Sequence, residues 1–216
     1  MIRALVFDMD GLLLDSERIV QRSWDEAGKE MGIPDLGKHI YNTLGMNRKA
    51  RNRYFLSTFG ADFALETFNR MTSDVFFRIV GETGIPLKPG AKELLEYAKK
   101  HGFKIAVATS SSSGYAVQEL KDAGIWQYFD SGVFGNMIEH AKPDPEIYLK
   151  ACECIGISPS ECFAFEDAPA GIRSAHAAGL KVIAVPDLVQ PDGELLALVY
   201  KKLDTLHDAI PLLKEE

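Results

Sequence analysis

Short stretches of the chain are apolar without interruption, a pattern typical of strands that are buried on both faces. They lie at residues 4–8, 104–109, 162–167 and 181–186, with a weaker fifth at residues 131–135. A strand with one face in water would alternate between apolar and polar positions instead. The pattern therefore predicts a parallel sheet that is covered by helices on both sides.

Helical periodicity fills the intervals between these strands. Apolar residues recur at helical spacing over residues 90–102, 113–124, 144–156 and 168–179, and each segment ends in a glycine suited to a left-handed C-cap. Strands and helices in alternation form βαβ units with parallel strands. We therefore expect an α/β fold with a Rossmann-like, doubly wound parallel sheet.

A long segment after the first strand interrupts this alternation. It contains no good strand pattern. It shows helical spacing in three stretches, at residues 16–32, 47–60 and 61–81. An insertion of this length predicts a second, all-α domain. We expect a core domain of residues 1–15 and 88–216 and a helical cap of residues 16–87, joined by two crossings that form a hinge.

Composition and charge narrow the classes of function. The chain is 46% hydrophobic and 25% charged, with a net charge of −7, which is typical of globular proteins and unlike the basic surface of a nucleic-acid or membrane-surface binder. No apolar run approaches the roughly 18 residues that span a bilayer. The first residues lack the features of a signal peptide. We expect a cytoplasmic protein without nucleic-acid or membrane partners. The sequence does not determine the oligomeric state, and we take a monomer as our expectation.

The cysteines Cys152, Cys154 and Cys162 are odd in number and lie close together in the sequence. Cys152 and Cys154 fall on different faces of a predicted helix, an arrangement that suits neither a disulfide nor a zinc site. We therefore expect all three to be reduced packing residues.

Polar and charged residues gather at the ends of the predicted strands. In an open α/β sheet, ligands bind beyond the carboxyl ends of the strands, so residues at these positions meet at one edge. The residues are Asp8 and Asp10 after the first strand, Thr109, Ser110 and Ser111 after the second, Lys142 before the helix at 144–156, and Glu166 and Asp167 at the end of the strand at 162–167.

The two acidic residues at the end of the first strand, Asp8 and Asp10, indicate a metal site. Asp8 and Asp10 would repel each other, and burying them would cost several kcal/mol unless a proton or cation joined them. Oxygen ligands suit a hard divalent ion, and Mg²⁺ is the usual choice beside a phosphate. Gly11 permits the turn out of the sheet. A tight turn with a solvated acid remains an alternative for this segment alone, and the second acidic strand end weighs against it.

The remaining groups suit an anion, although each has a plainer explanation when taken alone. Thr109 and the serines at 110–113 offer hydroxyls and N–H groups near a helix start at Ser113, and could also be a simple cap. Lys142 could be a solvated charge in a helix start that Asp144 caps. Glu166 and Asp167 could likewise be a helix cap. Their convergence on one edge favours a site.

Motifs in the order FDMDG (7–11), VATS (107–110), KPDPEIY (142–148) and FEDAPAGI (165–172) resemble a known family. It is the haloacid dehalogenase superfamily, specifically its β-phosphoglucomutase-like phosphatases with a helical cap. The likeness covers nearly the whole chain. FDMDG alone is a weak signal, whereas the ordered set is highly specific.

The resemblance implies a covalent mechanism. Asp8 is similar to the nucleophile that accepts the phosphoryl group as an aspartyl-phosphate. Asp10 is similar to the general acid and base that protonates the leaving oxygen and then activates water. The implied substrate is a small phosphorylated metabolite, either a sugar phosphate or a nucleotide-like monoester.

The resemblance also implies a phosphate site and a cofactor. Thr109, Ser110 and Ser111 match the phosphate-holding motif, and Lys142 matches the lysine that neutralises the phosphate and Asp8. The implied cofactor is Mg²⁺. Its implied ligands are Asp8, Asp167 with Glu166 close by, and the backbone carbonyl of Asp10.

The cap sequence differs from that of the phosphoglucomutases of the family. They carry a histidine on the first cap helix, in a DT…H…W pattern, whereas this chain reads DSERIVQRSW, with Val20 at the histidine position and Trp24 at the tryptophan position. Valine cannot exchange a proton, so we expect a hydrolase. Arg78 is the nearest cation to the place of the mutase's cap lysine. Arg48, in GMNR, is expected to contact a substrate phosphate or sugar.

Within the hydrolases, the core motifs look like those of pseudouridine-5'-phosphatase and 2-deoxyglucose-6-phosphatase. This likeness lies in the core and leaves the substrate open. Two alternatives to a phosphatase remain: a sugar-phosphate mutase, and a non-catalytic module that binds phosphate ligands. Intact chemistry at every strand end weighs against the second.

Overall fold

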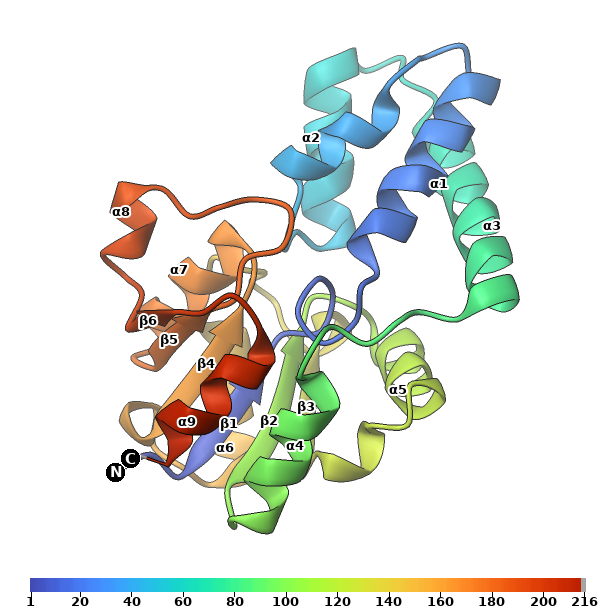
Figure 1. Ribbon diagram of the computed structural model, residues 1–216. Helices are drawn as coiled ribbons and strands as arrows, with labels where there is room; N and C mark the ends of the chain where they lie inside the picture. The colour runs from blue at the N-terminus through green and yellow to red at the C-terminus, as the bar shows by residue number, and fades with distance from the viewer. Residues whose placement is uncertain (215–216) are drawn as a thin grey trace.

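The computed structural model describes residues 1–214, which contain a six-stranded sheet with all strands parallel (Figure 1). The strands follow the order β3-β2-β1-β4-β5-β6 across the sheet. Their bounds are Ala4–Phe7 (β1), Lys104–Thr109 (β2), Ser131–Phe134 (β3), Cys162–Glu166 (β4), Lys181–Ala184 (β5) and Lys201–Lys202 (β6). The five predicted strands are confirmed, and the two-residue β6 is an addition that apolar patterning does not predict.

The register of the central strands brings the predicted site residues to one edge. β1 lies between β2 and β4, and Phe7 is paired with Val107 on one side and Phe165 on the other. Asp8, which follows Phe7, therefore lies beside the last residues of both neighbouring strands. We call this side of the sheet the carboxyl edge.

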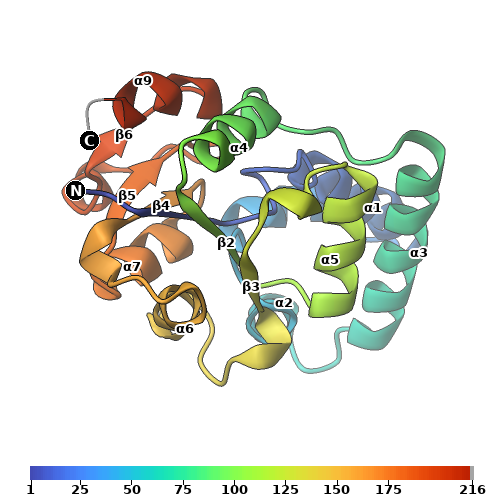
Figure 2. The ribbon, with the colours of Figure 1, turned by 90° about the horizontal axis from the view of Figure 1, so that it is seen from below.

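Helices cover both faces of the sheet, as Figure 2 shows from below. On one face, Leu5 and Phe7 pack against α4 (Ala91–Lys100), α5 (Ser113–Asp122) and α9 (Ala209–Leu213). On the other, Ala4 and Val6 pack against α6 (Glu146–Ile155), α7 (Pro169–Ala177) and α8 (Gly193–Leu196). Each strand buries both sets of side chains, which explains the uninterrupted apolar runs. The α/β prediction is confirmed.

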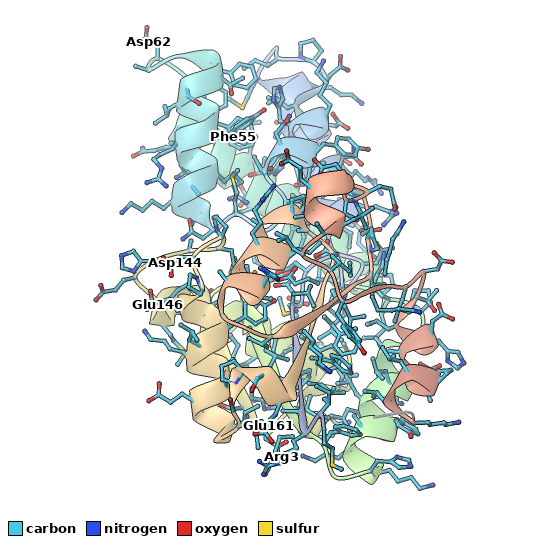
Figure 3. All side chains as sticks on the ribbon, turned by 90° about the vertical axis from the view of Figure 1, so that its left-hand side faces the viewer. Arg3, Phe55, Asp62, Asp144, Glu146 and Glu161 are labelled. Carbon is cyan, nitrogen blue, oxygen red and sulfur yellow. The ribbon has the colours of Figure 1, made fainter. Side chains whose placement is uncertain are left out.

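The inserted segment forms an all-helical cap beyond the carboxyl edge (Figure 1). It contains α1 (Glu17–Glu30), a 3₁₀ helix (Leu36–Asn42), α2 (Arg48–Phe59) and α3 (Leu65–Thr83). Its own apolar cluster joins Trp24, Phe55 and Phe68, and Phe55 lies at its centre on α2 (Figure 3). This cluster is distinct from the two that cover the sheet, and Ala168, just before α7, joins it from the core. The 3₁₀ helix was not predicted.

The two crossings between core and cap are hydrogen-bonded to each other. The backbone N–H of Asp15 donates to the carbonyl of Pro86 at 2.8 Å, and that of Lys88 donates to Leu13 at 2.9 Å. Asp187, in the loop after β5, accepts hydrogen bonds from Arg18 at 2.7 Å and Lys88 at 2.8 Å. One buried carboxylate therefore ties both crossings to the core.

The cysteine prediction is partly wrong. Cys152 and Cys162 are free and buried, with sulfur atoms 3.7 Å apart, as expected of reduced packing residues. Cys154 is also free but exposed, because it lies on the opposite side of α6. No helix among residues 1–214 is long and apolar enough to cross a membrane.

Candidate active site

Five of the predicted residues form a buried group at the carboxyl edge. Asp8 follows β1, Thr109 ends β2, Glu166 ends β4 and Asp167 follows it, while Lys142 comes from the loop before α6. All five side chains are largely shielded from solvent. The structure thus brings together groups that lie more than 150 residues apart in the chain.

Lys142 is the cation of this group. Its Nζ lies 2.5 Å from Oδ1 of Asp8 and 2.7 Å from Oε1 of Glu166. Tyr148, one turn into α6, donates its hydroxyl to the same Glu166 oxygen. Burial lowers the pKa of Lys142, but the carboxylates of Asp8 and Glu166 outweigh it and raise that pKa overall. The lysine therefore stays charged, as a buried ion needs partners.

The start of α6 holds Lys142 in place. Asp144 accepts a hydrogen bond from the backbone N–H of Glu146, the first residue of α6, at 3.0 Å. The N-cap of α6 is Pro145, however, so the expectation that Asp144 caps this helix is wrong by one residue. Ser174 of α7 donates to the Asp144 carbonyl at 2.6 Å. Figure 3 shows Asp144 and Glu146 at this helix start. The loop is therefore fixed directly after the residue that reaches the carboxylates.

Asp10 lies apart from Lys142 and is held by hydroxyl groups. Ser16 donates to its Oδ1 at 2.8 Å, and Ser111 donates to its Oδ2 at 2.7 Å. Burial raises the pKa of Asp10, the charge of Asp8 raises it further, and the two hydroxyls oppose this in part. A carboxyl group that retains its proton more readily is suited to donate one. Ser16 is the N-cap residue of α1, but its side chain makes no capping hydrogen bond, because its hydroxyl binds Asp10 instead.

The serine run after β2 connects core and cap. The backbone N–H of Ser111 donates to the Thr109 hydroxyl at 3.1 Å, and the Ser110 hydroxyl donates to the carbonyl of Gly45 at 3.0 Å. Gly45 belongs to the cap segment before α2. This contact was not predicted, and it holds the cap against the strand end that carries the candidate phosphate residues.

The acidic cluster fits a hard divalent cation. Carboxylate oxygens of Asp8, Glu166 and Asp167 lie within 4.8 Å of one another. Oδ1 of Asp167 is buried and has no hydrogen-bond partner among residues 1–214. Burial, followed by the charges of Asp8 and Glu166, raises the pKa of Asp167 well above its usual range. One lysine does not balance three buried carboxylates, and an oxygen-bound divalent ion would.

Two glycines make room for these acids. Gly11 has a φ of 82°, and a Cβ atom there would overlap Oδ2 of Asp167. A Cβ atom at Gly171, in α7, would overlap the carboxyl group of Glu166. The turn at Gly11 was predicted, whereas both close approaches depend on the tertiary structure and were not.

Replacement of Gly171 by alanine is expected to displace Glu166 and destabilise the protein by about 1–3 kcal/mol, the usual cost of overpacking a core. The matched control is Gly81→Ala in the exposed part of α3, where nothing lies within 4 Å of the new methyl group. Alanine in a helix is favourable there by about 0.5–1 kcal/mol. Urea unfolding of both variants checks this; a Gly171→Ala protein as stable as the wild type would contradict the close packing.

A cavity of about 420 Å³ separates this group from the cap. Its core side includes Asp8, Asp10 and Thr109, and its cap side includes Val20 and Arg48. The predicted place of Arg48 at the site is thus supported by its position on the cavity wall. Arg78 does not line the cavity; it pairs with Glu26 instead, which removes it as a cap cation for a substrate.

Sequence reasoning missed three residues of this region. Tyr148 binds Glu166 as described, and Glu17 and Arg51 line the cavity from the cap. Arg51 lies three residues after Arg48 on α2, a spacing that places both on one side of a helix and was the only available signal. In the sequence alone, Glu17 and Arg51 resemble ordinary charged residues on a solvent-exposed surface.

Comparisons with known proteins agree with this geometry. The family model for haloacid dehalogenase-like hydrolases matches residues 2–179. The chain is 31% identical to a phosphorylated carbohydrates phosphatase of Thermotoga maritima, covering 84% of each chain. It is 34% identical to hexitol phosphatase A of Escherichia coli, covering 85% of this chain and 82% of that protein.

A solved structure shows the same arrangement. The chain is similar to CbbY from Rhodobacter sphaeroides in complex with phosphate, with a TM-score of 0.81 and 29% identity. The match covers 97% of this chain and 96% of the other. Core and cap are therefore both part of the shared fold.

Proposed function

The chain belongs to the haloacid dehalogenase-like hydrolases, and on this premise we propose that it hydrolyses small phosphate monoesters with Mg²⁺ through a phosphoryl intermediate on Asp8. Phosphatases of phosphorylated carbohydrates and hexitols among its relatives support the class of reaction. The observation that carries the proposal is the contact between Asp8, which lines the cavity, and Lys142 behind it at 2.5 Å. It places a nucleophile beside a cation that attracts phosphate.

Asp8 would attack the phosphorus atom. A bond forms between an Asp8 carboxylate oxygen and phosphorus while the bond from phosphorus to the ester oxygen breaks. Asp10 gives its proton to the leaving oxygen, so the alcohol departs neutral. Water then attacks the phosphorus, Asp10 takes its proton, and inorganic phosphate leaves with Asp8 restored. The raised pKa of Asp10 supports the first of its two roles.

The phosphoryl oxygens would be held by Lys142 and by the segment after β2. The Thr109 hydroxyl and the backbone N–H of Ser110 belong to residues that line the cavity beside Asp8. Such donors stabilise the negative charge of the transferring group. The hydrogen bond of Ser111 to Asp10 would meanwhile keep the proton donor oriented.

Mg²⁺ would bind to Asp8, Asp167 and the backbone carbonyl of Asp10, with Glu166 close by. The unpaired, buried Oδ1 of Asp167 supports this choice of ligand. When bound, the ion neutralises charge on the phosphoryl oxygens and lets two anions approach. Oε1 of Glu166 is already used by Lys142 and Tyr148, so Glu166 would chiefly hold the lysine.

Removal of divalent ions by EDTA is expected to abolish hydrolysis of p-nitrophenyl phosphate, and added Mg²⁺ is expected to restore it. Mg²⁺ should also raise the melting temperature of the wild type, because a ligand that binds only the folded state stabilises it. Asp167→Asn should lose most of this shift, and the exposed Asp204→Asn should keep it. Full activity after chelation would contradict the metal assignment.

The cap would open and close over this site as a unit of residues 16–87. The paired crossings at Leu13–Asp15 and Pro86–Lys88 support a hinge at this place. Closure would exclude water from the aspartyl-phosphate until Asp10 is positioned to activate one molecule.

The residues around the cavity argue against the alternative function, a sugar-phosphate mutase. Val20 lines the cavity at the position of the mutase histidine and has no proton to exchange, and Arg78 faces away to Glu26. Incubation with β-glucose 1-phosphate and a trace of glucose 1,6-bisphosphate separates the two reactions. We expect free phosphate; accumulation of glucose 6-phosphate would support the mutase.

A further inference from the structure

A pocket of about 240 Å³ lies outside the active site, where the chain returns from the cap to the core. We call it the crossing pocket. Its lining comes from the end of α3 with the crossing after it, and from the end of α5: Val80, Gly84, Ile85, Glu119, Asp122 and Ala123. The residue after Ile85 is Pro86, whose carbonyl accepts the hydrogen bond that pairs the two crossings. An occupant of this pocket would therefore contact cap and core at once.

Aromatic rings separate the crossing pocket from the active-site cavity. α3 and α5 lie side by side (Figure 2), and the ring of Tyr115 on α5 packs against Phe76 and Phe77 on α3, with centroid distances of 6.1 and 6.4 Å. All three rings line the active-site cavity. The crossing pocket begins one turn further along both helices, at Glu119 and Val80. It is therefore a separate place on the molecule.

The carboxyl group of Glu119 has no partner in the described part of the chain. The residue is 9% exposed, and its carboxyl oxygens make no hydrogen bond or ion pair with any of residues 1–214. Asp122 adds a second negative charge at the pocket and accepts a hydrogen bond from Gln118 at 2.9 Å. Burial raises the pKa of Glu119, and the charges of Asp122 and Asp10 raise it further. A buried carboxylate without a cation is unfavourable, and a bound cation would remove that penalty.

The rest of the lining is apolar. Val80, Ile85 and Ala123 lie beside the two acids, and the last two of them pack against the apolar cluster under α4, α5 and α9. Among the described residues, no lysine or arginine lines the pocket. A Cβ atom at Gly84 would have nothing within 4 Å, so the space beside it is open. A hard metal ion needs six or so oxygen ligands, whereas a cation with a hydrocarbon body matches both the acidic and the apolar part of this lining.

We propose that the crossing pocket binds a primary aliphatic amine in its ammonium form. The ammonium group would donate hydrogen bonds to the carboxylate of Glu119, with Asp122 adding attraction, and the alkyl chain would lie against Val80, Ile85 and Ala123. Hydrogen bonds between charged groups are about twice as strong as neutral ones. The amine would hold the end of the last cap helix against α5. The proposal does not depend on the phosphatase function, because the residues that line this pocket are not those proposed for catalysis.

The test compares n-butylammonium with two probes that each lack one half of it, n-butanol and ammonium. The wild-type protein is titrated with each probe and followed by amide NMR, with Mg²⁺ and inorganic phosphate present to occupy the active site. We expect n-butylammonium to shift the amide signals of residues 80–85 and 119–123. It should bind about tenfold or more tightly than either probe, because n-butanol lacks the charge and ammonium lacks the apolar surface. Equal affinity for n-butylammonium and n-butanol would overturn the proposal, and so would shifts confined to the active site.

Glu119→Gln keeps the size of the side chain and removes its charge. We expect it to weaken binding of n-butylammonium about tenfold or more, the scale of a hydrogen bond to a charged group, and to leave binding of n-butanol unchanged. Glu93→Gln, at an exposed position of α4, is the matched control and should bind like the wild type. Ala123→Leu is an independent variant, since leucine occupies space that the alkyl chain needs, and it should weaken both probes. Affinity like that of the wild type in Glu119→Gln would overturn the proposal.

Thermal unfolding gives a second, independent measurement. Without amine, Glu119→Gln should melt at or above the temperature of the wild type, because it removes a buried charge that has no partner. n-Butylammonium should raise the melting temperature of the wild type and of Glu93→Gln, and not that of Glu119→Gln. A marked loss of stability in Glu119→Gln would show that the carboxylate is paired within the protein and would contradict the proposal. Shifts at residues 119–123 that Ca²⁺ causes and n-butylammonium does not would assign the pocket to a metal instead and overturn it.

Discussion

Asp8→Asn is expected to lower turnover of p-nitrophenyl phosphate about 10⁴-fold or more, the scale seen when a nucleophile is removed. The amide keeps the shape of the carboxylate, but it is a poor nucleophile towards phosphorus. The other groups at the site remain, including the pair of Lys142 with Glu166 at 2.7 Å. The loss should therefore appear in kcat and be independent of substrate.

The same variant should be at least as stable as the wild type. Asp8, Glu166 and Asp167 form a buried cluster of three acids, and removing one charge relieves repulsion between them. Asp62→Asn, at an exposed position in the cap (Figure 3), is the control for the chemical change alone. Urea unfolding with EDTA present measures both. Activity like that of the wild type in Asp8→Asn would rule out Asp8 as the nucleophile.

Lys142→Met is expected to destabilise the fold by about 3–5 kcal/mol, because it leaves buried carboxylates without their cation. Lys142 contacts both Asp8 and Glu166, and its side chain is 1% exposed. Turnover should also be lost, since Lys142 is the cation that contacts the proposed nucleophile Asp8. Methionine has a similar length, so the loss is one of charge.

Lys150→Met provides the comparison for Lys142. Lys150 also pairs with a glutamate, Glu146, at 2.6 Å, but its side chain is 41% exposed. Solvent screens such a pair, and its removal costs about 0–1 kcal/mol. Equal unfolding free energies for Lys142→Met and Lys150→Met would contradict the view that the buried lysine holds the acids together.

The strands and the site residues at their ends were predictable because one physical rule governs both. Strands buried on two faces must be apolar throughout, so a polar residue marks the place where a strand reaches its edge. Asp8, Thr109 and Glu166 each mark such a place, and the structure puts them side by side. β6 escaped this rule, because it consists of two exposed lysines at the border of the sheet.

The wall of the cavity opposite the acids was not predictable in the same way. Glu17 and Arg51 are polar residues on cap helices, where a charged side chain usually points to water. Their position at the site depends on how the cap lies against the core, through contacts such as that of Ser110 with Gly45. No local pattern encodes that arrangement.

Hydroxyl groups at the site show the same limit. Ser16 and Ser111 have the sequence context of helix starts, where serine commonly caps a helix. In the structure both hydroxyls donate to Asp10, from segments almost one hundred residues apart. The hydrogen-bond partners of these two hydroxyls depend on tertiary contacts, which local capping rules do not describe.

Trapping the intermediate tests the central claim most directly. In Asp10→Asn, the phosphoryl group should still transfer from p-nitrophenyl phosphate, because nitrophenolate leaves without a proton, but no base remains to activate water. The protein is mixed with substrate and Mg²⁺, quenched in acid and mapped by peptide mass spectrometry. We predict a phosphoryl group on Asp8. A phosphoryl group on any other residue, or release of nitrophenolate with no adduct on Asp8, would contradict the account.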